Sequence, residues 1–412
     1  MRILVTVSAW PGHWYPLVPS ARALQDAGHD VLVACAPSQE PGLRAAGLPT
    51  AAVLGAVDIG FLGRLQSVWN AQAGRWPYPQ PPLHPVTAAP MGSLAEFTFA
   101  QFRQAVDERV TRPTVAAQDA AVALARRWRP DLVVHELLSL EGLLAAEVVG
   151  VPALLHLWGP VGTREDEPGL HLTPADPTGA FVRHGLPAFT ADRVRHVVDP
   201  CPEPLRPPVD GTRHPVRYEP YNGPGTGSAA PAPVGPRPRV AVVWGGSAGT
   251  VVGRQAFVLP DVVRALAALG LDGVVTAGAA DVALLRELLG PDGPPPGVEV
   301  RTAAPLRDVL PGCSAVVHHG GAGVSMTSVD AGVPQLLVPC AVDQPVVARR
   351  IAATGAGVVL PAHAADGDAL TATLADLLAD GGRATAALDL RRAAHALPAA
   401  RDAVADWTAL AS

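Results

Sequence analysis

The chain has 412 residues and a formal net charge of −6, with 49% hydrophobic and 17% charged residues. This balance excludes a disordered or coiled-coil chain, and the lack of a dense basic run argues against a nucleic-acid-binding protein. Because one hydrophobic core seldom serves a chain of this length, we expect two domains of about 200 residues each.

The first half of the chain alternates strands with helices. Apolar runs predict strands at residues 3–7 and 31–34 on either side of a helix at 17–27, and further strands at 132–134 and 153–157. A strand, a helix and a second strand joined by short loops are typical of a parallel sheet. The sequence therefore predicts an α/β fold whose first domain is a doubly wound parallel sheet.

Proline and glycine crowd the chain between residues 200 and 238, which predicts a loop-rich linker at 206–238. We expect an N-terminal domain at 1–205, a second domain at 239–390 and a helix at 391–412 that packs back toward the first domain. The second half repeats the alternation, which predicts a second doubly wound sheet. Its expected strands lie at residues 239–243, 274–276, 298–300, 315–318 and 335–338.

Residues 60–110 hold seven aromatic side chains among prolines. Core filling and loop packing are the simpler interpretation. The alternative is an acceptor site, because aromatic walls suit a planar or macrocyclic ligand.

The most informative segment runs from Ala315 to Gln344. An apolar strand ends at His318 and His319, a Gly320-Gly321-Ala322-Gly323 turn follows, and a helix is expected to begin near Ser325. Small residues let a phosphate approach the backbone, and a helix N-terminus favours its negative charge. The segment therefore predicts a diphosphate site.

This segment resembles the nucleotide-sugar signature of the GT-B glycosyltransferases, specifically the bacterial family (glycosyltransferase family 1) that glycosylates natural products with dTDP-deoxysugars. The resemblance implies two Rossmann-like domains facing a central cleft. It also implies that His319 contacts the diphosphate and that Asp343 and Gln344 face the sugar hydroxyls. Carboxylate and carboxamide groups suit this role, because together they accept and donate hydrogen bonds.

The chain departs from the family pattern in the donor region. Val324 stands where the family has a phosphate-binding Thr, which leaves Ser325 and backbone groups to serve. No base-stacking Trp precedes Leu306, so main-chain contact near Leu306 is expected instead. The resemblance also places the Ser247 hydroxyl near the phosphate. The expected donor-binding residues are Gly12, Ser247, Leu306, His319, Gly321, Ala322, Gly323, Val324, Ser325, Asp343 and Gln344.

His13 is the expected catalytic base. It lies after the first strand, in a Gly-His-x-x-Pro segment that resembles the same family's catalytic loop. A neutral imidazole suits removal of a proton from an acceptor hydroxyl near pH 7. Glu136 is the expected carboxylate that stabilises the imidazolium, and Glu141 and Asp107 are less well placed. The alternative for Glu136 is a cap on the next helix.

No metal-ligand spacing and no DxD-like cluster is visible, which predicts metal-independent transfer without a cofactor beyond the nucleotide sugar. The resemblance implies inversion at the anomeric carbon. The expected partners are the sugar nucleotide and a small, apolar acceptor such as a polyketide aglycone, with no nucleic acid. The absence of a signal peptide or membrane span favours the cytoplasm. A monomer or a homodimer is expected.

Two other functions are compatible with the sequence. One is a binding or helper protein that keeps the fold without turnover, which Val324 and the missing Trp would favour. The other is a nucleotide-sugar epimerase on the same scaffold, which would need no apolar acceptor site.

Overall fold

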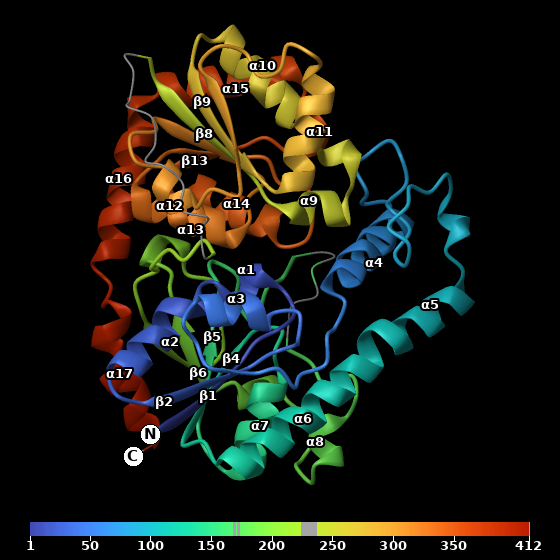
Figure 1. Ribbon diagram of the computed structural model, residues 1–412, viewed down its shortest axis with the longest axis vertical. Helices are drawn as coiled ribbons and strands as arrows, with labels where there is room; N and C mark the ends of the chain where they lie inside the picture. Colours follow the sequence, from blue (N-terminus) through green and yellow to red (C-terminus); the bar gives the residue numbers. More distant parts are fainter. Residues whose placement is uncertain (168–169, 171–173, 224–236, 412) are drawn as a thin grey trace. The chain divides into compact units, whose positions relative to one another are not determined.

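The computed structural model describes residues 1–167, 170, 174–223 and 237–411, and the chain divides into two compact units (Figure 1). Unit 1 comprises Met1–Ile59, Thr98–Pro224 and His395–Ser412. Unit 2 comprises Gly60–Phe97 and Gly225–Ala394. Each unit holds a parallel sheet with helices, so the predicted α/β class with two Rossmann-like domains is confirmed.

Unit 1 is built on a seven-stranded sheet of order β3-β2-β1-β4-β5-β6-β7 in which every pair is parallel. Its strands are β1 Arg2–Thr6, β2 Asp30–Ala34, β3 Thr50–Ala51, β4 Leu132–Glu136, β5 Ala153–His156, β6 His196–Asp199 and β7 Thr212–Pro215. Strand β7 falls inside the segment predicted as a linker. Its proline is tolerated because β7 lies at the sheet edge, where a missing N–H breaks no ladder.

The helices of unit 1 surround its sheet, except that α5 (Phe99–Val106) extends away from it (Figure 1). They are α1 Pro11–Trp14, α2 Leu17–Asp26, α3 Glu40–Ala45, α5 Phe99–Val106, α6 Arg112–Trp128, α7 Glu141–Val149, α8 Ala180–Arg183 and α17 Ala400–Thr408. Single turns are η3 Ala191–Arg193, η4 Glu203–Leu205 and η7 Ala409–Ala411, and a π-helical turn, η2 Asp107–Thr111, joins α5 to α6. Helix α6 ends at Trp128, and its C-cap residue Arg129 has a left-handed φ of 55°.

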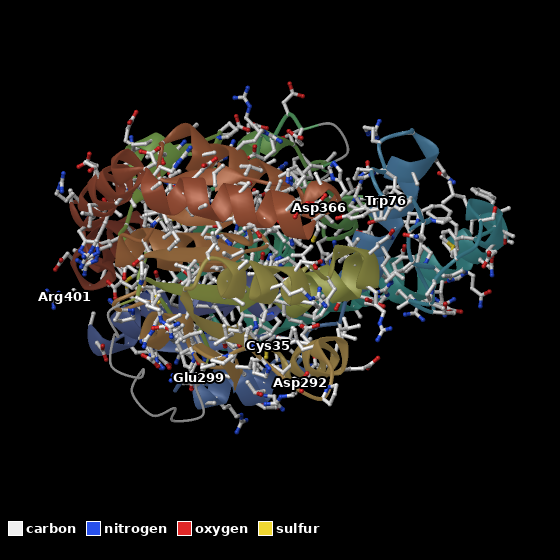
Figure 2. The ribbon with its side chains drawn as sticks, turned by 90° about the horizontal axis from the view of Figure 1, so that it is seen from above. Cys35, Trp76, Asp292, Glu299, Asp366 and Arg401 are labelled. Carbon is white, nitrogen blue, oxygen red and sulfur yellow. The ribbon has the colours of Figure 1, made fainter. Side chains whose placement is uncertain are left out.

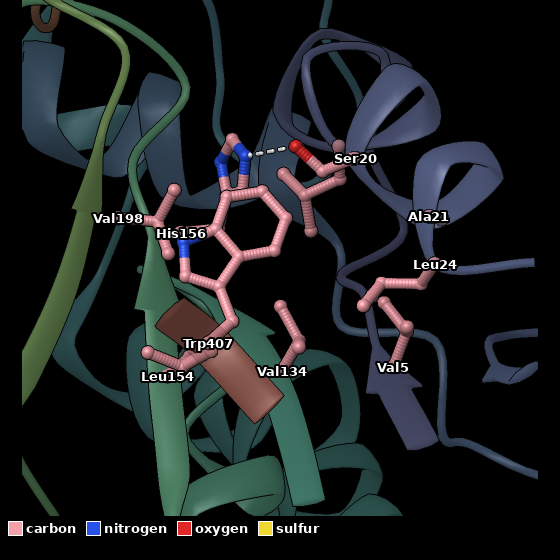
Figure 3. A pocket seen from close by; sticks show the side chains of 10 residues that line it. Val5, Ser20, Ala21, Leu24, Val134, Leu154, His156, Val198 and Trp407 are labelled. Atoms are coloured by element: carbon pink, nitrogen blue, oxygen red, sulfur yellow. Dashed lines mark hydrogen bonds between the residues drawn. The ribbon is translucent and has the colours of Figure 1, made fainter. Parts of the chain in front are cut away.

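The C-terminal helix α17 completes the core of unit 1. Trp407 is 2% exposed and packs among apolar side chains of the sheet and of α2. Figure 3 shows it beside His156, whose Nε2 lies 2.9 Å from Ser20 Oγ. The cavity that these side chains line measures about 10 Å³, which is too small for a sugar or an aglycone. His156 is therefore a structural residue of the core.

Unit 2 is built on a six-stranded parallel sheet of order β10-β9-β8-β11-β12-β13. Its strands are β8 Arg239–Trp244, β9 Asp272–Ala277, β10 Val298–Thr302, β11 Ala315–His318, β12 Gln335–Leu337 and β13 Gly357–Val359. In β8, Val240 and Val242 belong to one hydrophobic cluster and Ala241 and Val243 to another. Because side chains alternate along a strand, the sheet is buried on both faces.

The cluster that includes Val240 also contains residues of α10 (Leu259–Ala268) and α15 (Gly367–Ala379), and the cluster that includes Ala241 contains residues of α12 (Leu306–Val309). The helices of unit 2 are α4 Ile59–Gln72, α9 Gly246–Val251, α10 Leu259–Ala268, α11 Ala279–Leu289, α12 Leu306–Val309, α13 Ala322–Ala331, α14 Gln344–Ala353, α15 Gly367–Ala379 and α16 Gly381–His395, of which α4 and α16 each run one residue past the unit boundary. Single turns are η1 Leu94–Glu96, η5 Arg254–Ala256 and η6 Ala362–Ala364.

Residues 60–97 belong to unit 2, although the sequence placed them in the first domain. The buried Arg64 of α4 donates to the carbonyls of Pro85 and Thr250, at 2.9 and 3.1 Å. Tyr78 is 7% exposed, and its hydroxyl donates to the Cys340 carbonyl at 3.4 Å. Trp76, labelled in Figure 2, packs against the same core.

The aromatic side chains predicted either to fill cores or to line an acceptor site have different environments. Phe61 is fully buried, and Trp76 and Tyr78 pack in unit 2, as the simpler interpretation expected. Phe99, at the start of α5, is 72% exposed. An acceptor role for this segment stays a prediction.

Candidate active site

His13 lies on α1, directly after β1 at the carboxyl end of the first sheet. The sequence predicted a loop here, but Pro11 occupies the first helical turn, where its fixed φ favours a helix. Gly12 precedes His13 and is exposed. A Cβ at this glycine would come within 3.3 Å of Trp10 Nε1.

The His13 imidazole is held by two residues that the sequence did not single out. It stacks on Trp158, with 4.1 Å between ring centroids and 13° between the planes. Its Nδ1 lies 3.0 Å from Ser8 Oγ. Burial lowers the pKa of His13 to about 3, so the ring is neutral at pH 7. With Nδ1 engaged by Ser8, Nε2 is the nitrogen that can accept a proton.

Glu136 ends β4, the strand next to β1, and is completely buried. Its carboxylate accepts hydrogen bonds from the backbone N–H of Ser8 at 2.8 Å and of Leu138 at 2.7 Å. Burial raises the pKa of Glu136 to about 7, and the nearby Glu141 adds to that rise, while hydrogen bonds from Leu138 and Ser8 oppose it.

The alternatives considered for the carboxylate have different contacts in the structure. Helix α7 has Leu140 as its N-cap, so Glu136 does not cap the next helix. Glu141 is bonded to Ser139 at 2.7 Å, and Asp107 pairs with Arg112 at 2.7 Å. Glu136 bonds the backbone N–H of Ser8, whose hydroxyl lies beside His13, and its role as the carboxylate partner of His13 stays a prediction.

His319 follows β11 in unit 2 and is 5% exposed. Its Nδ1 accepts from the backbone N–H of Gly321 at 3.1 Å, and burial lowers its pKa to about 4. The ring is therefore neutral and carries its proton on Nε2, which can donate to an anion. A Cβ at Gly321 would lie 2.5 Å from His319 Cε1, and one at Gly245 would lie 2.8 Å from Nε2. Both turns need glycine to admit the ring.

Helix α13 begins at Ala322, three residues earlier than predicted, with Gly321 as its N-cap. Ser325 is completely buried, and its Oγ has no hydrogen-bond partner among the described residues. Val324 packs against the cluster that includes Leu306. The backbone N–H groups of Ala322 and Gly323 lie at the positive end of the helix, and phosphate binding at this turn stays a prediction.

Leu306 is the first residue of α12 and is 4% exposed, so its side chain serves the core. The backbone before it is fixed by Thr276, at the end of β9. The Thr276 hydroxyl donates to the Ala304 carbonyl at 3.1 Å and accepts from the Ala304 N–H at 3.0 Å. Sequence reasoning missed Thr276, whose only signal is its place at the carboxyl end of a strand.

Gln344 connects two of the predicted donor segments. It is 4% exposed, and its Oε1 accepts from the Cys340 N–H and thiol, each at 3.0 Å. Its Nε2 donates to Ser247 Oγ at 3.5 Å. Asp343, half-buried, is the N-cap residue of α14. The two βα turns that carry Ser247 and Asp343 therefore meet at Gln344.

Val342, just before Asp343, has a φ of 57°. A β-branched residue is strained in this left-handed region, at a cost of about 1–2 kcal/mol. Val342→Gly should relieve this strain, but glycine loses more chain entropy on folding, which offsets part of the gain. We therefore expect the free energy of unfolding to rise by about 0.5–1 kcal/mol. Urea unfolding followed by circular dichroism measures the change. A decrease would contradict strain at Val342, and Val338→Gly in the core is the control expected to destabilise.

Neither a metal-binding cluster nor a membrane span is found in the described part of the chain. No group of three or more His, Cys, Asp or Glu side chains is placed to hold a metal ion within the described ranges. Among the helices described, none is both long and apolar enough to cross a bilayer.

Two segments of the chain match one protein family. Residues 261–410 match the C-terminal domain, and residues 99–230 the N-terminal domain, of the erythromycin biosynthesis protein CIII-like family. The chain is 32% identical over 414 residues to the 10-deoxymethynolide desosaminyltransferase of Streptomyces venezuelae, covering 95% of this chain and 92% of that one. It is 36% identical over 390 residues to the L-demethylnoviosyl transferase of Streptomyces niveus, covering 93% and 90%.

The solved structure of the glycosyltransferase VinC in complex with dTDP has the same fold. It aligns with a TM-score of 0.74 and 27% identity, covering 100% of this chain and 99% of VinC.

Proposed function

Because the chain belongs to the family of erythromycin biosynthesis protein CIII-like glycosyltransferases, we propose that it transfers a deoxysugar from dTDP to an apolar aglycone. It is a natural-product glycosyltransferase of the GT-B fold by its family and its architecture. The donor proposal is supported by the dTDP bound to VinC and by the desosaminyl and demethylnoviosyl transfers named for two relatives. The acceptor proposal is supported by 10-deoxymethynolide, the acceptor named for one of them.

In the proposed reaction the acceptor hydroxyl oxygen attacks the anomeric carbon of the sugar, and the bond to the β-phosphate oxygen breaks with inversion. His13 Nε2 removes the proton of the attacking hydroxyl. The negative charge that develops on the diphosphate is met by the Nε2–H of His319 and by the N-terminus of α13. No nucleophilic carboxylate is needed, because no covalent sugar intermediate forms.

Asp343 is proposed to accept hydrogen bonds from the sugar hydroxyls. Gln344 was expected to share that role, and Ser247 to lie near the phosphate. Because the buried Gln344 carboxamide bonds Cys340 and Ser247, we propose instead that these two residues, Gln344 and Ser247, hold the loop beside the donor. This assignment is supported by the contact between Gln344 and Ser247, which joins the turns after β8 and β12. Ligands of open α/β sheets bind at the carboxyl ends of the strands, where both turns lie.

The observation that carries the proposal is the neutral His13, fixed between Trp158 and Ser8 at the carboxyl end of the first sheet. Incubation with a dTDP-deoxysugar and a panel of polyketide aglycones, followed by mass spectrometry, tests it directly. A product heavier than the aglycone by one deoxysugar residue is expected. Sugar-nucleotide isomerisation without acceptor would instead indicate the epimerase, and binding without turnover the helper protein.

Transfer is expected to proceed at an unchanged rate in excess EDTA. The reason is that the His319 Nε2–H and the helix N-terminus take the place of a divalent cation at the diphosphate. The initial rate of product formation with and without EDTA measures this. Loss of the rate with EDTA and its return with Mg²⁺ or Mn²⁺ would refute metal independence.

A further inference from the structure

Ser8 lies between the two residues expected to handle the proton. Its Oγ is 3.0 Å from His13 Nδ1, and its backbone N–H donates to Glu136 Oε1 at 2.8 Å. The Ser8 side chain is also among the hydrogen-bonding groups that lower the pKa of Glu136. Strands β1 and β4 are neighbours in register, so Ser8, just past β1, faces Glu136 at the end of β4.

We propose that Ser8 relays the acceptor proton from His13 to Glu136, so that the buried carboxylate and not the imidazole keeps it. This proposal deepens the function proposed above and rests on it. His13 is the catalytic residue that touches the acceptor. Ser8 is a positioning residue that acts through its two neighbours.

The proposed proton transfers among the acceptor, His13, Ser8 and Glu136 balance. As the acceptor oxygen bonds to the anomeric carbon, its proton passes to His13 Nε2. The Nδ1 proton of His13 passes to Ser8 Oγ, and the Ser8 hydroxyl proton passes to the Glu136 carboxylate. The electron pair of the broken bond stays on the leaving diphosphate oxygen. The products are a neutral His13 in its other tautomer, an intact Ser8 hydroxyl and a glutamic acid.

The electrostatics of unit 1 favour this final location of the proton. The pKa of His13 is lowered to about 3 by burial, while that of Glu136 is raised to about 7, first by burial and then by Glu141. The neighbouring His135 and His156 have pKa values lowered to about 4 by burial, so both are neutral at pH 7. Neither ring therefore competes with Glu136 for the proton at pH 7.

A double-mutant cycle tests the relay. Ser8→Ala and Glu136→Gln are each expected to lower kcat roughly 10-fold. Each removes one hydrogen bond of the relay, and a barrier higher by about 1.4 kcal/mol corresponds to that factor. If Ser8 acts through Glu136, the double variant should lose no more than either single variant. A loss of about 100-fold in the double variant would show two independent effects and overturn the relay, as would a Ser8→Ala enzyme with the wild-type kcat.

The pH profile separates a relay from a purely structural role. Glu136 can receive the proton only as a carboxylate, so kcat of the wild type should rise with pH through about 7. In Ser8→Ala and in Glu136→Gln that rise should disappear, and Ser8→Thr, which keeps the hydroxyl, should restore it. An unchanged rise in Ser8→Ala would overturn the proposal. Ser139→Ala is the matched control, because it removes a buried hydroxyl bonded to Glu141 but outside the contacts that reach His13.

The same variants distinguish failure of the relay from failure of the proposed function. If His13→Ala is strongly impaired and Ser8→Ala is not, His13 remains the base and the relay is wrong. If His13→Ala keeps the wild-type kcat, the proposed base is wrong whatever Ser8→Ala does. Thermal unfolding and dTDP affinity of Ser8→Ala, both expected to match the wild type, show that its loss of rate is not a loss of folding.

Discussion

His13→Ala is expected to lower kcat for an aliphatic hydroxyl acceptor by about 100- to 10,000-fold, the usual contribution of a positioned base. Removal of the ring leaves the acceptor hydroxyl without a proton acceptor and Ser8 without its partner at 3.0 Å. A more acidic hydroxyl, such as that of a phenol, needs less help and should lose less. Initial rates at saturating donor, with both acceptor types, measure the difference.

Two controls separate loss of the base from loss of donor binding or of folding. Affinity for dTDP should be unchanged in His13→Ala, because His13 lies in unit 1 and the predicted donor turns carrying His319 and Asp343 lie in unit 2. His29→Ala is a matched histidine control in unit 1, whose Nδ1 contacts the N-terminal amine at 3.4 Å. An equal, negligible loss with both acceptors, when chemistry limits the rate, would remove His13 from the mechanism.

His319→Ala is expected to weaken dTDP binding about 10- to 100-fold, because a hydrogen bond to a charged group contributes about 1.5–3 kcal/mol. The Nδ1 of the ring is occupied by the Gly321 N–H, so the alanine variant loses the Nε2–H that faces the Gly245 turn. Isothermal titration calorimetry with dTDP measures the loss.

Gly245→Ala provides a second route to the same result. Its Cβ would lie 2.8 Å from His319 Nε2, so the ring must move even though no polar group is deleted. Asp343→Ala should instead weaken the sugar nucleotide more than dTDP. Unchanged dTDP affinity in both His319→Ala and Gly245→Ala would exclude His319 from the diphosphate site.

Local pattern predicted nine strands and the turns that follow them, but it missed the short strands β3, β6, β7 and β13, which have two to four residues each. The runs ending at His318 and near Glu136 are apolar enough to be buried strands, and they form β11 and β4. Because parallel strands end at one edge of a sheet, residues just after them can be assigned to a site from sequence position alone. The predicted start of α13 was wrong by three residues, since the small residues of a glycine-rich turn give little signal for a helix boundary.

Several features were decided only by packing between distant parts of the chain. No local pattern joins Ser8 to Glu136, 128 positions away, or stacks Trp158 on His13. Residues 60–97 were expected in the first domain, whereas they belong to unit 2. Tyr78 and Cys340 are separated by 262 positions, so their contact within unit 2 leaves no signal in any short segment.

Short segments of the sequence were enough to predict two parallel sheets and a glycine turn after His319, whereas His13 and Glu136 were chosen with the help of the resemblance to the glycosyltransferase family. The sheets and the turn follow from hydrophobic period and from the small size of glycine, which are properties of short segments. The tertiary structure alone decided that Ser8 links His13 to Glu136 and that Gln344 reaches Ser247. Such contacts depend on which strands become neighbours, and that is set by burial of the whole core and not by any one segment.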